Sequence, residues 1–187
     1  DPESALLMYR EEGYLPEALL NYLALLGWSM GEDREFFSMR QMAEAFDISR
    51  VSPNPARFDL KKCTAINGDW IRSLSPEEFG ERVVPFLQRA GLVAVPPTDR
   101  QRQVLAEAVP LVQERMETLA QSVAMLGFLF IDPADFAIDP EQSVADEESQ
   151  RVLVATLDAL TDLGEWAAGP IEQALRGALI DDLGLKP

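Results

Sequence analysis

Residues 13–29, GYLPEALLNYLALLGWS, predict a helix against which the rest of the chain packs. Pro16 has a fixed φ and no backbone N–H, so it suits the first turn of a helix. The leucines that follow lie at helical spacing and are expected to form one broad apolar face: Leu19, Leu20, Leu23 and Leu26. Gly27 stands where a left-handed C-terminal cap is expected. This stretch therefore predicts a core helix of an all-α domain.

The remaining sequence also predicts helices. Residues 75–78, SPEE, combine an N-cap serine, a proline at the first helical position and a glutamate at the third. Asp59 is expected to cap a short helix over Leu60–Ile66, which Asn67–Gly68 would end. No segment alternates apolar and polar residues over the length of a strand, and no repeat is present. We expect a first helical domain near 1–73 and a second helical unit that divides near residue 130.

Composition restricts the possible functions. The chain has 187 residues and a net charge of −16, which argues against indiscriminate binding to nucleic acid because phosphates would be repelled at long range. The charge is uneven, however. Residues 50–72 hold 5 basic and 2 acidic side chains, a net charge of +3, whereas residues 94–187 hold 6 basic and 17 acidic ones, a net charge of −11. A local basic surface on an acidic body can still meet RNA.

Few residues are suited to catalysis. The chain contains no histidine, which removes the most common general base and metal ligand. The single cysteine, Cys63, makes neither a disulfide framework nor a thiolate metal site and is expected to be partly buried. Glycine-rich phosphate loops are also absent. We therefore predict no catalytic residues and no metal site. No apolar run is long enough to span a membrane, and no secretory leader is present, so a cytoplasmic location is expected.

The strongest candidates for binding are basic. Pro53, Asn54 and Pro55 prevent a helix and predict a stiff loop between residues 46 and 58. Positive side chains lie in this loop and just after it: Arg50, Arg57, Lys61, Lys62 and Arg72. Such side chains contact phosphates, which position an RNA without reading its sequence. From the residues alone, a solvated charged surface is the preferred explanation.

Three blocks of sequence carry a family resemblance: residues 13–29, RVSPNPARFDLKK at 50–62 and INGDWIR at 66–72. In residue identity and spacing, these blocks resemble the part of a bacterial glutamyl-tRNA synthetase that follows the KMSKS-type ATP-binding loop. The resemblance is strong over residues 1–92 and looser beyond. It implies an internal fragment in which the catalytic domain is missing.

The resemblance also implies domains and site residues. It divides the chain into a stem-contact domain at 1–73, a first anticodon-binding helical subdomain at 74–129 and the truncated start of a second one at 130–187. Lys62 falls on a position that contacts tRNA in the family, and the carry-over to Arg57 is weaker. Arg115, in LVQERMETL at 111–119, matches a helix arginine that lies beside the third anticodon base. Without the resemblance, an exposed arginine paired with Glu114 or Glu117 explains Arg115.

Two functions remain open. In the first, the chain is the tRNA-binding portion of a glutamate–tRNA ligase, whose full form attaches glutamate to tRNA(Glu) with ATP and Mg²⁺. The piece itself would be an inactive monomer that needs no cofactor and binds neither DNA nor membranes. In the second, it is an acidic all-helical domain that binds another protein. Reversing the charges of Lys61 and Lys62 separates the two, because only the first requires them for RNA binding.

Overall fold

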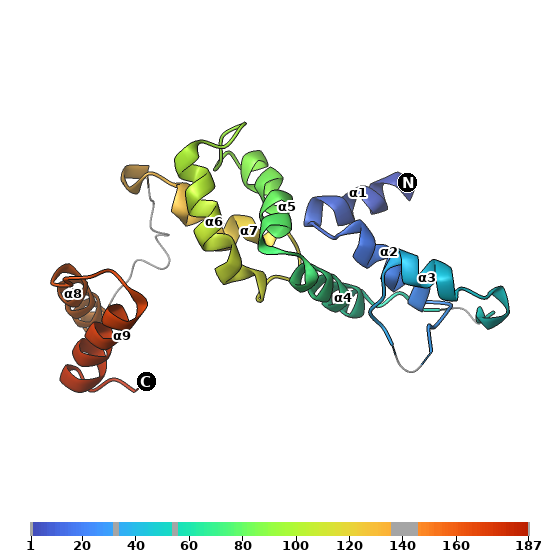
Figure 1. The fold of residues 1–187 in the computed structure, drawn as a ribbon. Helices are drawn as coiled ribbons and strands as arrows, with labels where there is room; N and C mark the ends of the chain where they lie inside the picture. Colours follow the sequence, from blue (N-terminus) through green and yellow to red (C-terminus); the bar gives the residue numbers. More distant parts are fainter. Residues whose placement is uncertain (1, 32–33, 54–55, 136–145, 187) are drawn as a thin grey trace. The chain divides into compact units, whose positions relative to one another are not determined.

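The computed structural model describes residues 2–31, 34–53, 56–135 and 146–186, and over these residues the chain is helical and contains no strand (Figure 1). The chain forms two compact units, Asp1–Phe136 and Ala137–Pro187. The helices of the first unit are α1 (Pro2–Glu12), α2 (Pro16–Leu25), α3 (Met39–Ala45), η1 (Ile48–Arg50), α4 (Leu60–Ser73), α5 (Pro76–Arg89), α6 (Asp99–Gln113), α7 (Gln121–Leu126), η2 (Gly127–Phe130) and η3 (Pro133–Asp135). The all-α prediction is confirmed.

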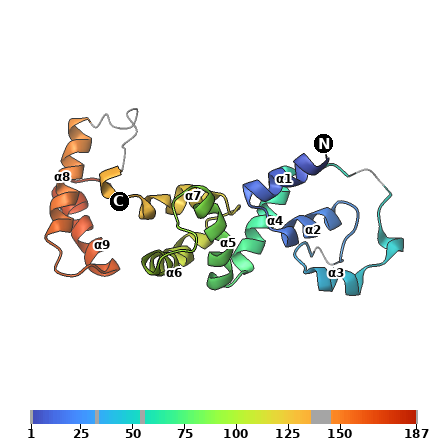
Figure 2. The ribbon, with the colours of Figure 1, turned by 90° about the horizontal axis from the view of Figure 1, so that it is seen from above.

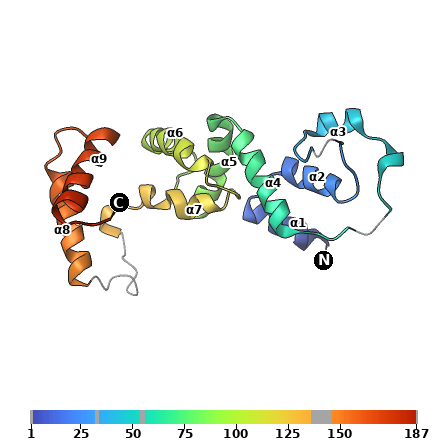
Figure 3. The ribbon, with the colours of Figure 1, turned by 90° about the horizontal axis from the view of Figure 1, so that it is seen from below.

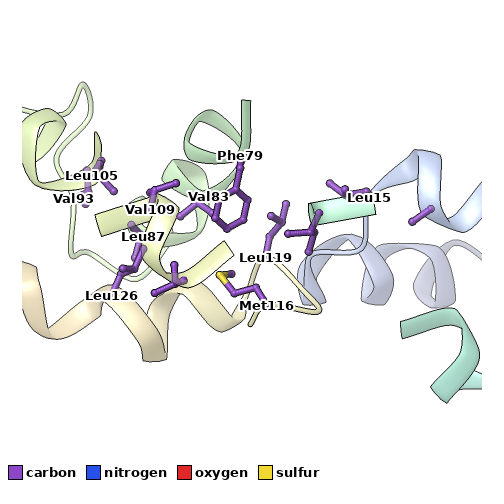
Figure 4. Packing of buried hydrophobic residues seen from close by; sticks show 13 residues of the cluster. Leu15, Phe79, Val83, Leu87, Val93, Leu105, Val109, Met116, Leu119 and Leu126 are labelled. Atoms are coloured by element: carbon purple, nitrogen blue, oxygen red, sulfur yellow. The ribbon is translucent and has the colours of Figure 1, made fainter. Parts of the chain in front are cut away.

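The larger hydrophobic core of the first unit lies among α5, α6 and α7 and extends to the start of α2 and the end of α4 (Figure 4). Phe79, Val83 and Leu87 line one face of α5 and are fully buried. Their spacing of four residues is close to the helical period of about 3.6 residues, so it places the side chains on one face. Met116 is also fully buried in this cluster, on the segment between α6 and α7.

Buried amide side chains fix α4 against its neighbours. Asn67 is fully buried, and its Oδ1 accepts a 2.8 Å hydrogen bond from the backbone N–H of Leu15. The Nδ2 of Asn67 donates to the carbonyl oxygen of Glu117 at 2.5 Å. At the C-terminal end of α4, Nε2 of Gln113 donates to the carbonyls of Ile71 and Leu74, at 2.9 Å each. Because buried polar groups are costly to leave unpaired, these bonds hold α4 in one position.

The helix predicted from residues 13–29 is present as α2, and Pro16 occupies its first turn. Its buried face differs from the prediction, because Leu20 and Leu23 are 44% and 52% exposed while Asn21 and Tyr22 are buried. The amide of Asn21 explains the difference, since its Oδ1 accepts from the backbone N–H of Phe37 and its Nδ2 donates to the carbonyl of Glu35. The left-handed cap at Gly27 is also wrong, because α2 ends at Leu25, its C-cap residue Leu26 is right-handed, and Gly27 does not have a positive φ.

The helix expected over Leu60–Ile66 continues to Ser73, so the predicted stop at Asn67–Gly68 is wrong. The cap at Asp59 is confirmed, because its carboxylate accepts a hydrogen bond from the backbone N–H of Lys62. Asn and Gly commonly end helices. Here, however, the side-chain amide of Asn67 forms hydrogen bonds with distant backbone groups, and Gly68 is buried. As a consequence, Arg72 lies on the same helix as Lys61 and Lys62.

The second unit consists of α8 (Glu147–Thr161), α9 (Ala168–Arg176) and the π-helical segment η4 (Gly177–Asp182), with α8 packed against both of the others. None of its described side chains is buried. Leu153, Val154 and Leu157 of α8 are 62%, 58% and 65% exposed. Over the described residues, no helix is both long and apolar enough to cross a membrane. The predicted boundaries at 73/74 and 129/130 stay predictions.

Candidate nucleic-acid interface

Helix α4 carries three of the predicted cations. Lys61 and Lys62 lie in its first turn and Arg72 in its last turn, and all three are exposed. Lys61 and Arg72 are eleven residues apart, which is about three turns of an α-helix, so they share one side at an axial separation of roughly 16 Å. An uninterrupted α4 therefore presents positive charge at both ends of a single face.

Two of these cations have acidic partners at the surface. The ammonium of Lys62 pairs with the carboxylate of Glu35, and their side chains are 43% and 56% exposed. The guanidinium of Arg72 is 2.7 Å from the carboxylate of Asp69, with exposures of 33% and 56%. Exposed ion pairs contribute about 0–1 kcal/mol, so a phosphate can replace the carboxylate at little cost. Glu35 also explains why a lysine is tolerated at the positive end of the α4 dipole.

Lys61 and Arg57 are exposed, and neither forms an ion pair with another described residue. Arg57 lies just before α4, on the chain that leads into Asp59. Asn54 and Pro55, part of the predicted stiff loop, lie outside the described residues. Lys61 and Arg57 are therefore the cations near the start of α4 whose charge no described carboxylate offsets.

Arg50 differs from the other predicted cations because it has a structural role. Its Nη2 donates a 2.9 Å hydrogen bond to the carbonyl of Ser29, and its guanidinium lies 5.7 Å from the ring centroid of Trp28. Arg50 ends η1, and Figures 2 and 3 show this segment beyond α3 and apart from α4. The structure thus groups Lys61, Lys62 and Arg72 on α4 and places Arg50 elsewhere.

Arg115, the predicted anticodon contact, is exposed in the turn that follows α6. Its Nη2 is 3.4 Å from the carbonyl of Leu111, and within the described chain it pairs with neither Glu114 nor Glu117. The ion-pair explanation for Arg115 therefore finds no support. The resemblance implied a position inside a helix, whereas α6 ends at Gln113 and Arg115 lies just beyond it.

A second cationic site was not predicted. Arg10 at the end of α1 and Arg82 and Arg89 on α5 line a cavity of about 240 Å³. We call this site the arginine pocket. Arg82 and Arg89 are seven residues apart, two helical turns, and this spacing was a usable signal in the sequence. The contribution of Arg10 depends on the fold bringing the end of α1 to the same cavity as α5, which spacing does not reveal.

A metal site and an activated thiol find no support among the described residues. Over the described chain, no group of three or more Asp, Glu, Cys or His side chains is placed to hold a metal ion. Cys63 is fully buried, and burial raises the pKa of its thiol to about 11. A thiol with a raised pKa carries little thiolate at neutral pH, which makes it a poor nucleophile. The cationic side chains are thus the chemistry that this surface offers.

Comparison with known proteins gives two family matches. Residues 78–187 match the model described as "Anticodon binding domain", and residues 4–65 match the model described as "tRNA synthetases class I (E and Q), catalytic domain". The second match means that the predicted absence of a catalytic domain is not confirmed. It also spans α2 and reaches the first turns of α4, where Lys61 and Lys62 lie.

Curated relatives match over the whole chain. A glutamate–tRNA ligase of Nocardioides sp. is 48% identical over 189 residues, covering 100% of this chain and 38% of the relative. That of Saccharopolyspora erythraea is 50% identical over 189 residues, covering 100% and 37%. A solved glutamate tRNA ligase from Elizabethkingia meningosepticum, in complex with its amino acid, is 26% identical with a TM-score of 0.73, covering 95% of this chain and 34% of its own. The chain thus spans less than two fifths of these relatives' length.

Proposed function

The chain belongs to the family of anticodon binding domains, and we propose that it is the tRNA-binding portion of a glutamate–tRNA ligase. The observation that carries this proposal is the uninterrupted helix α4, which holds Lys61 and Arg72 on one side. Its partner is tRNA(Glu), which the chain binds as a monomer in the cytoplasm. The curated relatives, each a glutamate–tRNA ligase, support the choice of tRNA.

Phosphate contacts and base contacts come from different places on this surface. Lys61, Lys62 and Arg72 contact phosphates of the tRNA stem, with Arg57 extending the contact before α4. These contacts set the position of the RNA without reading its sequence. Arg115 contacts an anticodon base, because a planar guanidinium donates to a base edge and stacks on an unpaired base. Arg50 holds its loop on Ser29 and contributes only the exposed edge of its guanidinium.

The full ligase would activate glutamate with ATP and Mg²⁺ and transfer it to the tRNA, and we expect this chain alone not to do so. Because the family model for the catalytic domain matches residues 4–65, the charging activity of this chain is tested directly. An assay of the chain with glutamate, ATP, Mg²⁺ and tRNA(Glu) should give no charged tRNA. Charging by the isolated chain would contradict this part of the proposal and leave tRNA binding intact.

The main test reverses two charges at the start of α4. The double variant Lys61→Glu/Lys62→Glu should bind tRNA(Glu) at least about tenfold more weakly, with a shallower dependence of log Kd on log salt by about 2, because two phosphate contacts are lost. Filter binding from 50 to 300 mM KCl measures both quantities. Arg40→Glu/Arg176→Glu changes the net charge equally at exposed sites, 88% and 62%, and should have less than a twofold effect.

Two outcomes would overturn the proposal. One is equal binding of tRNA and another polyanion, such as heparin, by the native chain at every salt concentration. The other is an unchanged affinity for tRNA in the Lys61 and Lys62 variant when its circular dichroism matches the native chain. The second possible function, a domain that binds protein, would predict this indifference. The exposed apolar side chains of α8 and the net charge of −16 are the observations that favour it.

A further inference from the structure

We propose that the arginine pocket, lined by Arg10, Arg82 and Arg89, binds a phosphodiester group of the RNA backbone. This inference rests on the proposed function and adds a contact away from the cations of α4. The pocket is notable because the chain carries a net charge of −16, yet no acidic side chain lines the cavity. Phosphate oxygens are the anionic groups that arginine recognises with paired N–H donors.

Arg82 is fixed in place by the carboxylate of Glu17. Its Nη1 and Nη2 donate to the two oxygens of Glu17 at 3.2 Å and 3.0 Å, which joins α5 to α2. The pKa of Arg82 is raised, first by its hydrogen bond to Glu17 and also by the nearby charge of Glu78. Arg82 is therefore a fixed wall of the pocket whose charge is largely offset. The net positive charge available to a ligand comes from Arg10 and Arg89.

Arg89 is already oriented for binding, because its guanidinium lies 4.4 Å from the ring centroid of Phe86. Holding the side chain on an aromatic ring lowers the entropy that binding has to overcome. Arg10 is exposed in the last turn of α1, and neither arginine forms an ion pair with another described residue. Arg10 and Arg89 lie in the last turns of α1 and α5, at the negative ends of the helix dipoles, which stabilise their charges without neutralising them.

The turn between α1 and α2 supplies no competing donor. The backbone N–H groups of Gly13, Tyr14 and Leu15 already donate to Arg10 O, Tyr9 O and Asn67 Oδ1. Pro16 has no N–H. An anion in the pocket is therefore held by arginine side chains, while the exposed prolines of the lining, Pro16 and Pro85, provide a surface for ribose.

The pocket adjoins α4 through one side chain. Tyr14 lines the cavity, and its hydroxyl lies 2.6 Å from Oγ1 of Thr64. Thr64 is three residues after Lys61, so about one helical turn separates them along α4. An RNA strand that reaches Lys61 thus has the arginine pocket within the span of a few nucleotides, which is why we assign the ligand to the RNA backbone rather than to a free anion.

The test removes the two uncompensated charges. Arg10→Gln/Arg89→Gln should weaken binding to tRNA(Glu) about tenfold at 0.15 M KCl and reduce the salt slope by about 2, as expected for two lost phosphate contacts. The matched control, Arg40→Gln/Arg176→Gln, removes the same charge from arginines outside the pocket and should change affinity less than twofold. Thermal melting of each variant shows whether the fold is retained.

A second variant is expected to act in the opposite direction. Glu17→Gln keeps a neutral acceptor beside Arg82 and removes the negative charge, so tRNA affinity should rise about threefold. Because loss of an ion pair destabilises the fold, tighter binding by this variant cannot come from damage to the structure. Weaker or unchanged binding by Glu17→Gln would count against the pocket, even if the double arginine variant failed to fold.

The outcomes separate the two proposals. If the native chain does not bind tRNA, the proposed function fails and the pocket proposal fails with it. If the native chain binds tRNA but the folded Arg10 and Arg89 variant binds equally well, only the pocket proposal is overturned. Inorganic phosphate identifies the source of the anion: at constant ionic strength, 10 mM phosphate should displace little tRNA from the native chain. Strong displacement that disappears in the double variant would instead assign the pocket to free phosphate.

Discussion

Asn67 shows at the scale of one residue how a polar side chain can support a binding surface without touching the ligand. Its amide bonds to the backbone of Leu15 and of Glu117, two segments far away in the sequence. Because an unpaired buried amide would cost about 1–3 kcal/mol, these contacts favour one orientation of α4 over others. The cations on α4 are carried by a helix whose position this buried residue fixes, although sequence alone suggested that Asn67 is a helix stop.

Gly13 provides a prediction at the same scale. It has a φ of +85°, and a Cβ atom would lie 2.6 Å from the N of Leu119 and 2.7 Å from the N of Ala120. Gly91 also has a positive φ, +74°, but nothing lies within 4 Å of its Cβ position. Gly91→Ala should therefore cost about 1 kcal/mol of unfolding free energy through backbone strain alone. Gly13→Ala should cost at least about 2 kcal/mol more, because the backbone at 119–120 must move.

Urea unfolding, followed by tryptophan fluorescence, compares these two variants. Trp28 and Trp70 pack inside the first unit and report on it. Equal losses of stability in Gly13→Ala and Gly91→Ala would show that close approach to residues 119–120 is not what requires glycine at position 13. The hydrogen bond from Leu119 N to Gly13 O, 3.0 Å long, would then persist in the variant.

At the scale of elements, the contact between α2 and α5 depends on pH. Burial raises the pKa of Glu17, but its hydrogen bonds, chiefly from Arg82, and the charge of Arg82 outweigh burial, so the net pKa is lowered. A carboxyl whose pKa is lower in the folded state stabilises fully above its unfolded pKa, and the contribution is lost as pH falls through the folded value. The native chain should thus exceed Glu17→Gln in unfolding free energy at pH 7, and the difference should shrink as the pH falls through the lowered pKa of Glu17 in the folded state.

The size of this difference is limited by solvent. The side chains of Glu17 and Arg82 are 38% and 34% exposed, so screening keeps the contribution near about 0.5–1 kcal/mol. Urea titrations of both proteins at pH 7, 5 and 3 measure it, and 0.5 M KCl should reduce it. A difference that grows on acidification would contradict the sign of the pKa change.

The helices themselves show which features were predictable. The start of α5 was predicted from residues 75–78 because an N-cap serine and a capping glutamate act within one turn. The predicted helix stop at Asn67–Gly68 was wrong because the Asn67 amide forms hydrogen bonds with distant backbone groups. Rules based on neighbouring residues do not include such tertiary contacts. The arginine pocket was missed for the same reason, since only the folded chain brings Arg10 of α1 to the same cavity as Arg82 and Arg89 of α5. Local signals predicted element starts, and long-range packing determined the site.

At the scale of the whole molecule, the negative charge is distributed over both units. Residues 137–187 hold 3 basic and 11 acidic side chains, a net charge of −8, and residues 1–136 carry the other −8. The same net charge is carried by 51 residues in the second unit and by 136 in the first, so the second unit is more densely negative, and burial also distinguishes the units. The first unit has fully buried side chains on α4 and α5, such as Cys63, Ile71 and Phe79. The described residues of the second unit include none.

This difference in burial predicts a difference in local stability. Amide hydrogens exchange when a segment opens, and segments with few buried apolar contacts open at low free energy. Amides of α8 and α9 should therefore exchange at least about 100-fold faster than those of α4 and α5, after correction for intrinsic rates. Hydrogen–deuterium exchange with mass spectrometry measures both units in one sample, so the first unit is the internal control. Equal protection would mean that another surface covers Leu153, Val154 and Leu157 in solution, and those exposed side chains would then be the place to look for a partner.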